Sequence, residues 1–244
     1  MTKTPPSHRY LPKGLSILYE DNEILVVNKP AGLLTIATNR EKTKTAYAAL
    51  TDYVKKGNLK SRNRVFIVHR LDKDTSGILL FAKSEKTKLN LQSNWQNFQK
   101  IYFAVCEGGI KQKSGVLSNY LAESKVGRVY VTENQNEGKL SITEYEVLKE
   151  TKSYSLLKII LKTGRKHQIR VQFAHNHHSI VGDKKYGNTQ NKLPRMALHA
   201  YSIQFLHPIT NKSMLFEAEI PNFITSLVGG YEKFQTPENK QDSI

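Results

Sequence analysis

Two carboxylates and a Thr-Ser-Gly turn interrupt an apolar segment in the sequence HRLDKDTSG of residues 69–77. The runs VFIV (65–68) and ILLFAK (78–83) flank the interruption. A strand that stops for charged residues and resumes at once is typical of a strand that carries a functional site. Taken alone, the motif is equally consistent with a polar turn in which Asp72 and Asp74 accept hydrogen bonds from the local backbone.

An aromatic residue and two arginines stand in two further stretches that could act with this carboxylate. Tyr102 lies in the expected strand KIYFAV, where a purely structural aromatic side chain is also expected. The sequence LKTGRKHQIR predicts a strand-to-helix turn that directs Arg165, Arg170 and backbone N–H groups toward anions. A carboxylate, a stacking ring and a forked arginine suit chemistry at a nucleoside sugar. None of the three stretches is specific by itself.

Taken together and in order, the motifs resemble the RluA family of pseudouridine synthases, which isomerise uridine in ribosomal or transfer RNA. The motifs are HRLDKDTSG, KIYFAVCEG, TGRKHQIR, VGDKKYG and ALHAYSI, and the resemblance covers residues 17–223. It implies an α+β fold in which a central mixed, mostly antiparallel sheet is split by a basic active-site cleft. It also implies that the enzyme uses no cofactor and no metal.

The resemblance implies roles for four side chains. Asp72 matches the essential catalytic aspartate, and Arg170 matches the arginine that pairs with it. Tyr102 matches the active-site tyrosine, and Arg70 matches an arginine that enters the RNA stack. One departure is Gln172, because the family usually has histidine at that position. This departure puts in doubt a role for a histidine there but does not affect Asp72.

Pseudouridine formation requires a uridine that is flipped out of its stack, at a cost of about a few kcal/mol. We expect Arg70 to fill the gap, Asp72 to act on the ribose, and Tyr102 to stack on the base and relay a proton. The detached uracil needs apolar walls, for which Leu198 is a candidate. Asp74 is assigned to the turn. Phosphate contacts are expected from three residues of the strand-to-helix turn, Arg165, Lys166 and His167.

The elements that must position these residues follow from apolar periodicity. Strands are expected at SILYE, EILVVNK, VFIV, GILLFAK, KIYFAVCEG, VLSNYL, RVYVTE, SITEYEVLKE, YSLLKIILKT, LHAYSIQFLHP and MLFEAEIP. Helices are expected in KTAYAALTDYVKK, from an N-cap at Ser84 to about Phe98, and in RKHQIRVQFAHN. We expect an N-terminal arm at 1–14, a pseudouridine synthase catalytic domain at 15–232 and a flexible tail at 233–244.

The composition favours a polyanionic partner. The 244 residues include 37 Lys and Arg against 21 Asp and Glu, a net charge of +16, so nucleic acid is the leading candidate, and the resemblance implies RNA. The basic residues are spread over a folded body, although a basic solvated surface without a partner is the alternative. The N-terminus lacks a signal-peptide pattern and no run is long enough to span a membrane, so we expect a cytoplasmic protein without a membrane partner. We also expect a monomer. The lone Cys106 is expected to be a buried apolar residue.

Two alternative functions remain from the sequence. A non-catalytic RNA-binding or ribosome-assembly factor could share the charge and the fold, but it would not need a carboxylate in a cleft that receives a polyanion. A metal-dependent nuclease could use Asp183 and the four histidines of the segment 167–178. His167 and His175 are eight residues apart, which places them off a common helix face, and the neighbouring basic run repels a cation.

Overall fold

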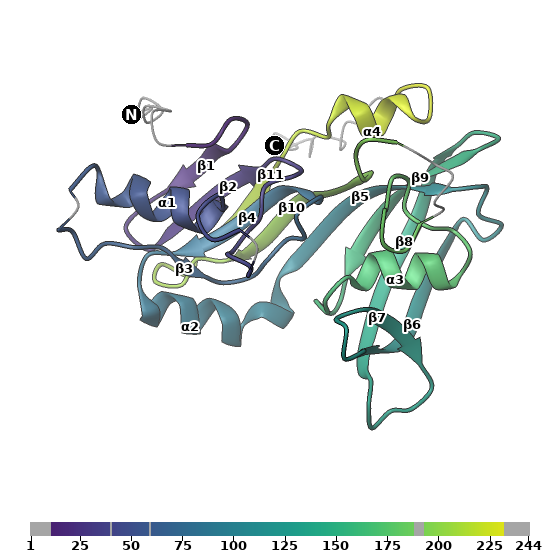
Figure 1. The fold of residues 1–244 in the computed structure, drawn as a ribbon, viewed down its shortest axis with the longest axis horizontal. Coiled ribbons are helices and arrows are strands. Elements are labelled where there is room, and N and C mark those ends of the chain that lie inside the picture. The colour runs from purple at the N-terminus through teal and green to yellow at the C-terminus, as the bar shows by residue number, and fades with distance from the viewer. Residues whose placement is uncertain (1–10, 40, 59, 188–192, 232–244) are drawn as a thin grey trace, which may run out of the picture.

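An eleven-stranded sheet runs through the computed structural model, which describes residues 11–39, 41–58, 60–187 and 193–231 (Figure 1). The strands are β1 Ser16–Glu20, β2 Ile24–Lys29, β3 Phe66–Ile67, β4 Ser76–Ala82, β5 Gln99–Glu107, β6 Ser114–Glu123, β7 Val129–Thr132, β8 Lys139–Glu150, β9 Tyr154–Leu161, β10 Leu198–Leu206 and β11 Ser213–Glu217. The helices are α1 Ala46–Lys55, α2 Glu85–Ser93, α3 Gln168–His175 and α4 Asn222–Ser226, and a 3-10 helix spans Trp95–Asn97. The expected tail and most of the expected arm lie outside the described residues.

The strand order is β1-β2-β4-β10-β5-β9-β8-β6-β7, with β3 beside β4 and β11 beside β10. Figure 1 shows β1, β2, β4, β10 and β5 in this order from left to right and the remaining strands of this order on the right, with α1 and α2 beside the N-terminal half and α3 beside the C-terminal half. Neighbouring strands pair antiparallel except β10 with β4, which are parallel. The expected mixed, mostly antiparallel α+β architecture is therefore confirmed.

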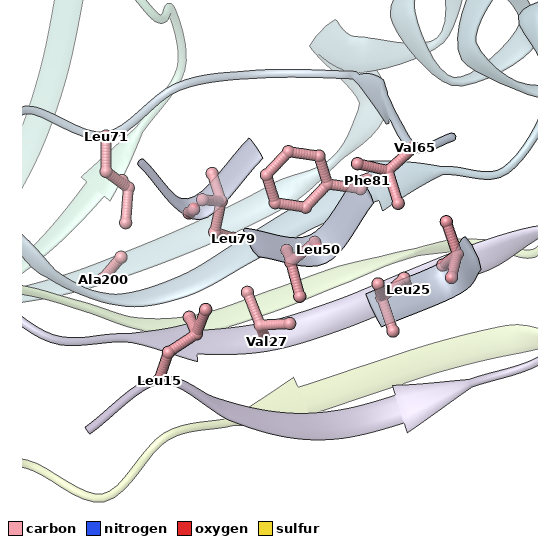
Figure 2. Packing of buried hydrophobic residues seen from close by; sticks show 11 residues of the cluster. Leu15, Leu25, Val27, Leu50, Val65, Leu71, Leu79, Phe81 and Ala200 are labelled. Carbon is pink, nitrogen blue, oxygen red and sulfur yellow. The ribbon is translucent and has the colours of Figure 1, made fainter. Parts of the chain in front are cut away.

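The N-terminal half of the sheet buries both of its faces, because successive strand residues point to opposite sides. Leu25 of β2 packs with Leu50 of α1 in one cluster, part of which is shown in Figure 2. Val26 packs with Leu91 of α2 in a second cluster. The hydroxyl of Ser84 accepts the N–H of Thr87 at 3.1 Å, so the expected N-cap of α2 is confirmed. Two helices therefore enclose this half of the sheet.

The C-terminal half is likewise covered on both faces. Ile169 and Phe173 of α3 pack against β5 and β9 in one cluster that includes Cys106. Ile224 of α4 packs with Val105 of β5 in another cluster. Cys106 is fully buried, in agreement with its expected role as a small apolar residue. Because α3 is packed over most of its length, its position relative to the sheet is fixed.

The two halves meet at a short parallel contact between β4 and β10. This contact consists of the pairs His199–Ser76 and Ala200–Gly77, after which β10 pairs with β11. Gly77 has a φ of +108°, and a Cβ there would lie 2.1 Å from the carbonyl oxygen of Ala200, so only glycine fits. The Ser76 hydroxyl lies 2.8 Å from His199 Nδ1. Strand β4 thus begins at Ser76, which the sequence assigned to a turn, one residue before the expected strand GILLFAK.

Three helix expectations need correction. The helix that begins after Ser84 ends at Ser93 and does not reach Phe98, because a separate 3-10 turn follows. Helix α3 begins at Gln168 and not at Arg165, because the preceding residue has a left-handed backbone that cannot continue a helix. The five-residue α4 was not expected from the sequence, and its residues carry too short a pattern for an assignment.

Candidate active site

The loop of residues 68–75 connects β3 to β4 and carries Asp72. It is fixed from both faces of the sheet, since Val68 packs in one apolar cluster and Leu71 in the other. The Thr35 hydroxyl accepts the N–H of Leu71 at 3.2 Å and donates to its carbonyl at 2.8 Å. With its neighbours held in this way, the Asp72 side chain is still 26% exposed. The loop therefore holds the Asp72 carboxylate in a fixed position.

His69, the first residue of the motif, is a structural support. Its Nε2 accepts the N–H of Leu80 at 3.0 Å, and its ring lies 4.5 Å from that of Trp95. Burial lowers the pKa of His69 to about 3, and the charge of Lys100 acts in the same direction. The imidazole is therefore neutral and completes the hydrogen bonding of β4.

Lys29, at the end of β2, donates a hydrogen bond to the loop that carries Asp72. Its side chain is fully buried, and its Nζ donates to the carbonyls of Pro30, Leu33 and Lys73 at 3.0, 2.8 and 3.1 Å. Burial lowers the pKa of Lys29 to about 7, while Asp74 and then Asp72 act to raise it. One ammonium group thus ties the segment after β2 to the residue next to Asp72.

We expect Lys29→Met to lower the free energy of unfolding by about 2–5 kcal/mol, because it leaves buried carbonyl oxygens without their donor. Urea unfolding measures this change. The exposed Lys86→Met is the matched control and should change the unfolding free energy by less than about 0.5 kcal/mol. Equal stability of the two variants would contradict this role of Lys29.

The pKa of Lys29 also gives this stability a pH dependence. Between about 7 and the ordinary value of 10.5, the unfolded chain holds more protons at this position than the folded chain does. The free energy of unfolding contributed by Lys29 therefore rises with pH across that window. In Lys29→Met the free energy of unfolding should rise less than in the wild type between pH 7 and pH 9.5, as urea unfolding measures. Part of the rise remains, because burial also lowers the pKa of Lys100, to about 8.

Arg170 of α3 connects two carboxylates. Its Nη1 donates to Asp72 Oδ2 at 2.6 Å, while its Nε and Nη2 donate to the two oxygens of Asp183 at 2.7 and 2.8 Å. The Arg170 side chain is 10% exposed and that of Asp183 is fully buried. Such a forked pair fixes the direction of a guanidinium as well as its position. Arg170 therefore approaches Asp72 from a fixed direction.

Electrostatics stabilise this arrangement in its charged form. Burial alone would raise the pKa of Asp183, but Arg170 and the backbone N–H groups of Lys185 and Tyr186 lower it overall. Burial alone would lower the pKa of Arg170, but Asp183 and Asp72 raise it overall. The guanidinium is therefore charged throughout the physiological pH range.

A small recess of about 70 Å³ lies beside Asp72 and is lined by Tyr102 and Leu198. Tyr102 packs against the core clusters of both halves of the sheet. Burial and then the charge of Asp72 raise its pKa, so the phenol is neutral at physiological pH. Leu198 is buried, with 4% of its surface exposed. The recess thus combines apolar walls, an aromatic ring and a carboxylate.

The recess opens into a cleft of about 530 Å³ that is rich in positive charge. Asp72 lies in this cleft together with Arg70, Lys73, Lys100, Arg165 and Lys166. Arg70, Arg165 and Lys166 are exposed, although Lys166 contacts Glu123 and the Arg165 Nε donates to the carbonyl of Leu140 at 3.2 Å. The surroundings of the Asp72 carboxylate suit an anionic polymer.

His167 was expected to contact phosphate at the protein surface, but it lies largely buried beside Asp72. Its Nε2 is 3.7 Å from Asp72 Oδ1, and its side chain is 13% exposed. Its Nδ1 is 2.7 Å from the hydroxyl of Tyr186, and the ring of Tyr186 also lies under the guanidinium of Arg170. The structure therefore brings His167 to the carboxylate together with Arg170.

The sequence analysis did not predict a role in this site for three residues. Asp183 was considered only as a metal ligand, and Tyr186 and Lys29 were not considered. The signal that could have found the first two is the segment VGDKKYG, in which a carboxylate and an aromatic side chain stand next to two lysines. A lysine directly before Pro30 gives no signal of burial.

The comparisons with known proteins agree with this geometry. The family model described as RNA pseudouridylate synthase matches residues 23–175. A protein of Aquifex aeolicus (strain VF5), described as an RNA pseudouridine synthase, is 34% identical over 233 residues, which cover 90% of this chain and 73% of that protein. The chain belongs to the RNA pseudouridylate synthase family. It is therefore an RNA pseudouridine synthase, an isomerase that moves a uracil base within RNA.

A second relative and a solved structure support the assignment of this pseudouridine synthase to its family and fold. The ribosomal large subunit pseudouridine synthase D of Blochmanniella floridana is 34% identical over 238 residues, which cover 90% of this chain and 74% of that protein. The solved structure of human RNA pseudouridylate synthase domain containing 1 has a TM-score of 0.73 at 22% identity, covering 96% of this chain and 94% of that one. The relatives confirm the resemblance to the RluA family, and the solved structure confirms the fold.

Among the described residues, no three His, Cys, Asp or Glu side chains are grouped so that they could hold a metal ion. His175 and His177, considered for such a site, are exposed at the far end of α3 from His167. None of the helices in the described part of the chain is long and apolar enough to cross a membrane.

Proposed function

We propose that this enzyme isomerises specific uridines of ribosomal RNA to pseudouridine, and that Asp72 acts on the ribose of a flipped-out uridine. The observation that carries the proposal is the contact of 2.6 Å between Arg170 Nη1 and Asp72 Oδ2 at the mouth of a recess that Tyr102 lines. A carboxylate held in this way can stabilise positive charge that develops at an anomeric carbon.

In the proposed reaction the bond between N1 of the base and C1′ of the ribose breaks. The uracil turns within the recess, and a bond forms between C5 and C1′. The proton on C5 then leaves, and N1 takes up a proton, so that the product has the same composition as the substrate. Tyr102 stacks on the base and relays a proton, and Leu198 is part of the wall that keeps the detached base in place.

The charged cleft holds the RNA. Arg70 fills the gap that the flipped uridine leaves, because a guanidinium plane stacks well on bases. Arg165 and Lys166, which are exposed in the turn before α3, contact phosphates. These contacts fix the RNA relative to Asp72 without reading its sequence.

The choice of ribosomal RNA rests on the names of relatives that act on the large ribosomal subunit. Transfer RNA is the alternative substrate within the same reaction. We further propose that residues 15–232 form the catalytic domain and that the enzyme acts as a cytoplasmic monomer. In support, Asp72, Tyr102, Arg170 and Asp183 of a single chain complete the site.

Mapping of pseudouridine in total RNA, with and without the gene, tests this function. We expect at least one uridine of the large-subunit ribosomal RNA to lose its modification when the gene is deleted and to regain it when the gene is restored. A site in transfer RNA alone would replace ribosomal RNA as the substrate. Tight RNA binding by the purified protein without any pseudouridine formation would instead favour the binding-factor alternative.

A further inference from the structure

A chain of hydrogen bonds leads from β7 through Tyr186 and His167 toward Asp72. The Tyr186 hydroxyl oxygen accepts the N–H of Val129 at 3.2 Å and lies 2.7 Å from His167 Nδ1. Its own proton needs an acceptor, and among the described residues Nδ1 is the one within hydrogen-bond distance. We therefore assign the proton of the imidazole to Nε2, the nitrogen that faces Asp72.

The backbone of His167 points the ring in this direction. Its φ of 54° and ψ of 21° place it in the left-handed region directly before α3. This region is uncommon for residues other than glycine, and such conformations persist where the surrounding structure enforces them, often at functional sites. An extended or helical backbone would direct the side chain elsewhere.

The surroundings of His167 keep it neutral. Burial lowers its pKa and Asp72 acts in the opposite direction, but the charges of Arg170, Lys185 and Lys166 act with burial, so that the pKa is about 4. A neutral imidazole that accepts at Nδ1 has one donor, which is Nε2–H. This donor faces a carboxylate oxygen, Asp72 Oδ1, that Arg170 does not occupy, because Arg170 contacts Oδ2.

The gap between His167 Nε2 and Asp72 Oδ1 is 3.7 Å, which is too long for a direct hydrogen bond. It fits a hydroxyl oxygen that lies about 2.8 Å from both atoms, accepting from Nε2–H and donating to the carboxylate. The ribose hydroxyl next to the anomeric carbon is the 2′-OH, and bonds to that position strengthen in the transition state of glycoside cleavage. The 2′-OH also distinguishes RNA from DNA.

We propose that His167 is a catalytic residue that binds the 2′-OH of the target ribose together with Asp72, and that Tyr186 is the positioning residue that fixes its tautomer. This role replaces the phosphate contact expected from the sequence. It rests on the proposed function, because it requires that Asp72 acts on a ribose. The contact to the 2′-OH allows the site to discriminate uridine from 2′-deoxyuridine.

The test uses purified enzyme and a synthetic RNA stem-loop that carries a uridine identified by the mapping. His167→Asn retains a residue that tolerates the left-handed backbone and an acceptor for Tyr186, but removes Nε2–H. We expect its single-turnover rate at saturating RNA to fall at least about tenfold, the loss of one hydrogen bond. Tyr186→Phe keeps the imidazole but removes the hydroxyl that fixes the proton on Nε2. We therefore expect a smaller loss of rate than in His167→Asn.

His177→Asn is the matched control, because His177 also has a left-handed backbone, with a φ of 64°, but is exposed at the other end of α3. It should retain the wild-type rate. Thermal unfolding of each variant shows whether the fold is intact. A His167→Asn enzyme that keeps the saturating rate and only binds RNA more weakly would overturn the inference, because a phosphate contact gives that result.

A second measurement changes the substrate. The affinities of the wild type and of His167→Asn are compared for stem-loops with uridine or 2′-deoxyuridine at the target position. We expect the missing hydroxyl to weaken binding several-fold in the wild type and to have no effect in the variant. An equal loss of affinity in both enzymes would overturn the proposed contact between His167 and the 2′-OH. Failure of the proposed function would differ, because the wild type would then form no pseudouridine at all.

Discussion

Asp72→Asn is expected to lower pseudouridine formation by at least about a thousandfold, the scale seen when a charged group at a reaction centre is removed. Asparagine keeps the size and shape of the side chain and can still meet Arg170, whose Nη1 now lies 2.6 Å from Asp72 Oδ2. The fold and most of the RNA affinity should therefore be retained. The pseudouridine content of a known substrate RNA, measured over time, gives the rate.

Asp74→Asn is the matched control, because it makes the same change two residues away in the same loop. Asp74 is exposed, and the loop there is closed by the backbone bond from Thr75 N to the Asp72 carbonyl at 3.2 Å. The control should keep its activity within about threefold. If Asp74→Asn were the inactive variant, or if Asp72→Asn turned over normally, the catalytic assignment would be wrong.

Arg170→Gln is expected to have the second largest effect, on both stability and activity. It leaves the fully buried carboxylate of Asp183 without its forked partner, and breaking a buried pair in this way costs about 3–5 kcal/mol. It also removes the contact to Asp72. Urea unfolding gives the change in stability, and the pseudouridine assay gives the change in rate.

The double variant Arg170→Gln with Asp183→Asn separates the two effects. Because both buried partners are then neutral, much of the lost stability should return, and the asparagine can still accept the N–H groups of Lys185 and Tyr186. Activity should stay at least about a hundredfold below the wild type. Recovery of activity together with stability would show that Arg170 serves the fold alone.

The sequence predicts those parts of the structure whose signals lie within a short stretch of residues. The hairpin of β1 and β2, the cap at Ser84 and the antiparallel strands β5 to β9 follow from alternation and turn residues in one short window. The same holds for the placement of Asp72 in a break between strands. These features require no knowledge of distant parts of the chain.

Long-range features could not be predicted in this way. Lys29 reads as a charged residue at the end of a strand, but three carbonyls from two loops surround it in the folded chain. The pairing of Arg170 with Asp183 depends on where the loop after α3 returns to the helix. Likewise, the turn of His167 toward Asp72 depends on a left-handed residue for which no nearby sequence feature gives a signal.

The short parallel contact between β4 and β10 has a consequence for how the enzyme becomes active. Asp72 and Arg170 are 98 residues apart in the sequence, and Ser76 and His199, which join the two halves, are 123 residues apart. Closing loops of this length is slow, so contacts of this kind form late in folding. A chain that has not yet formed this contact therefore lacks the ion pair between Arg170 and Asp72, which we propose acts in catalysis. We expect modification of RNA to begin only after the whole sheet has been completed.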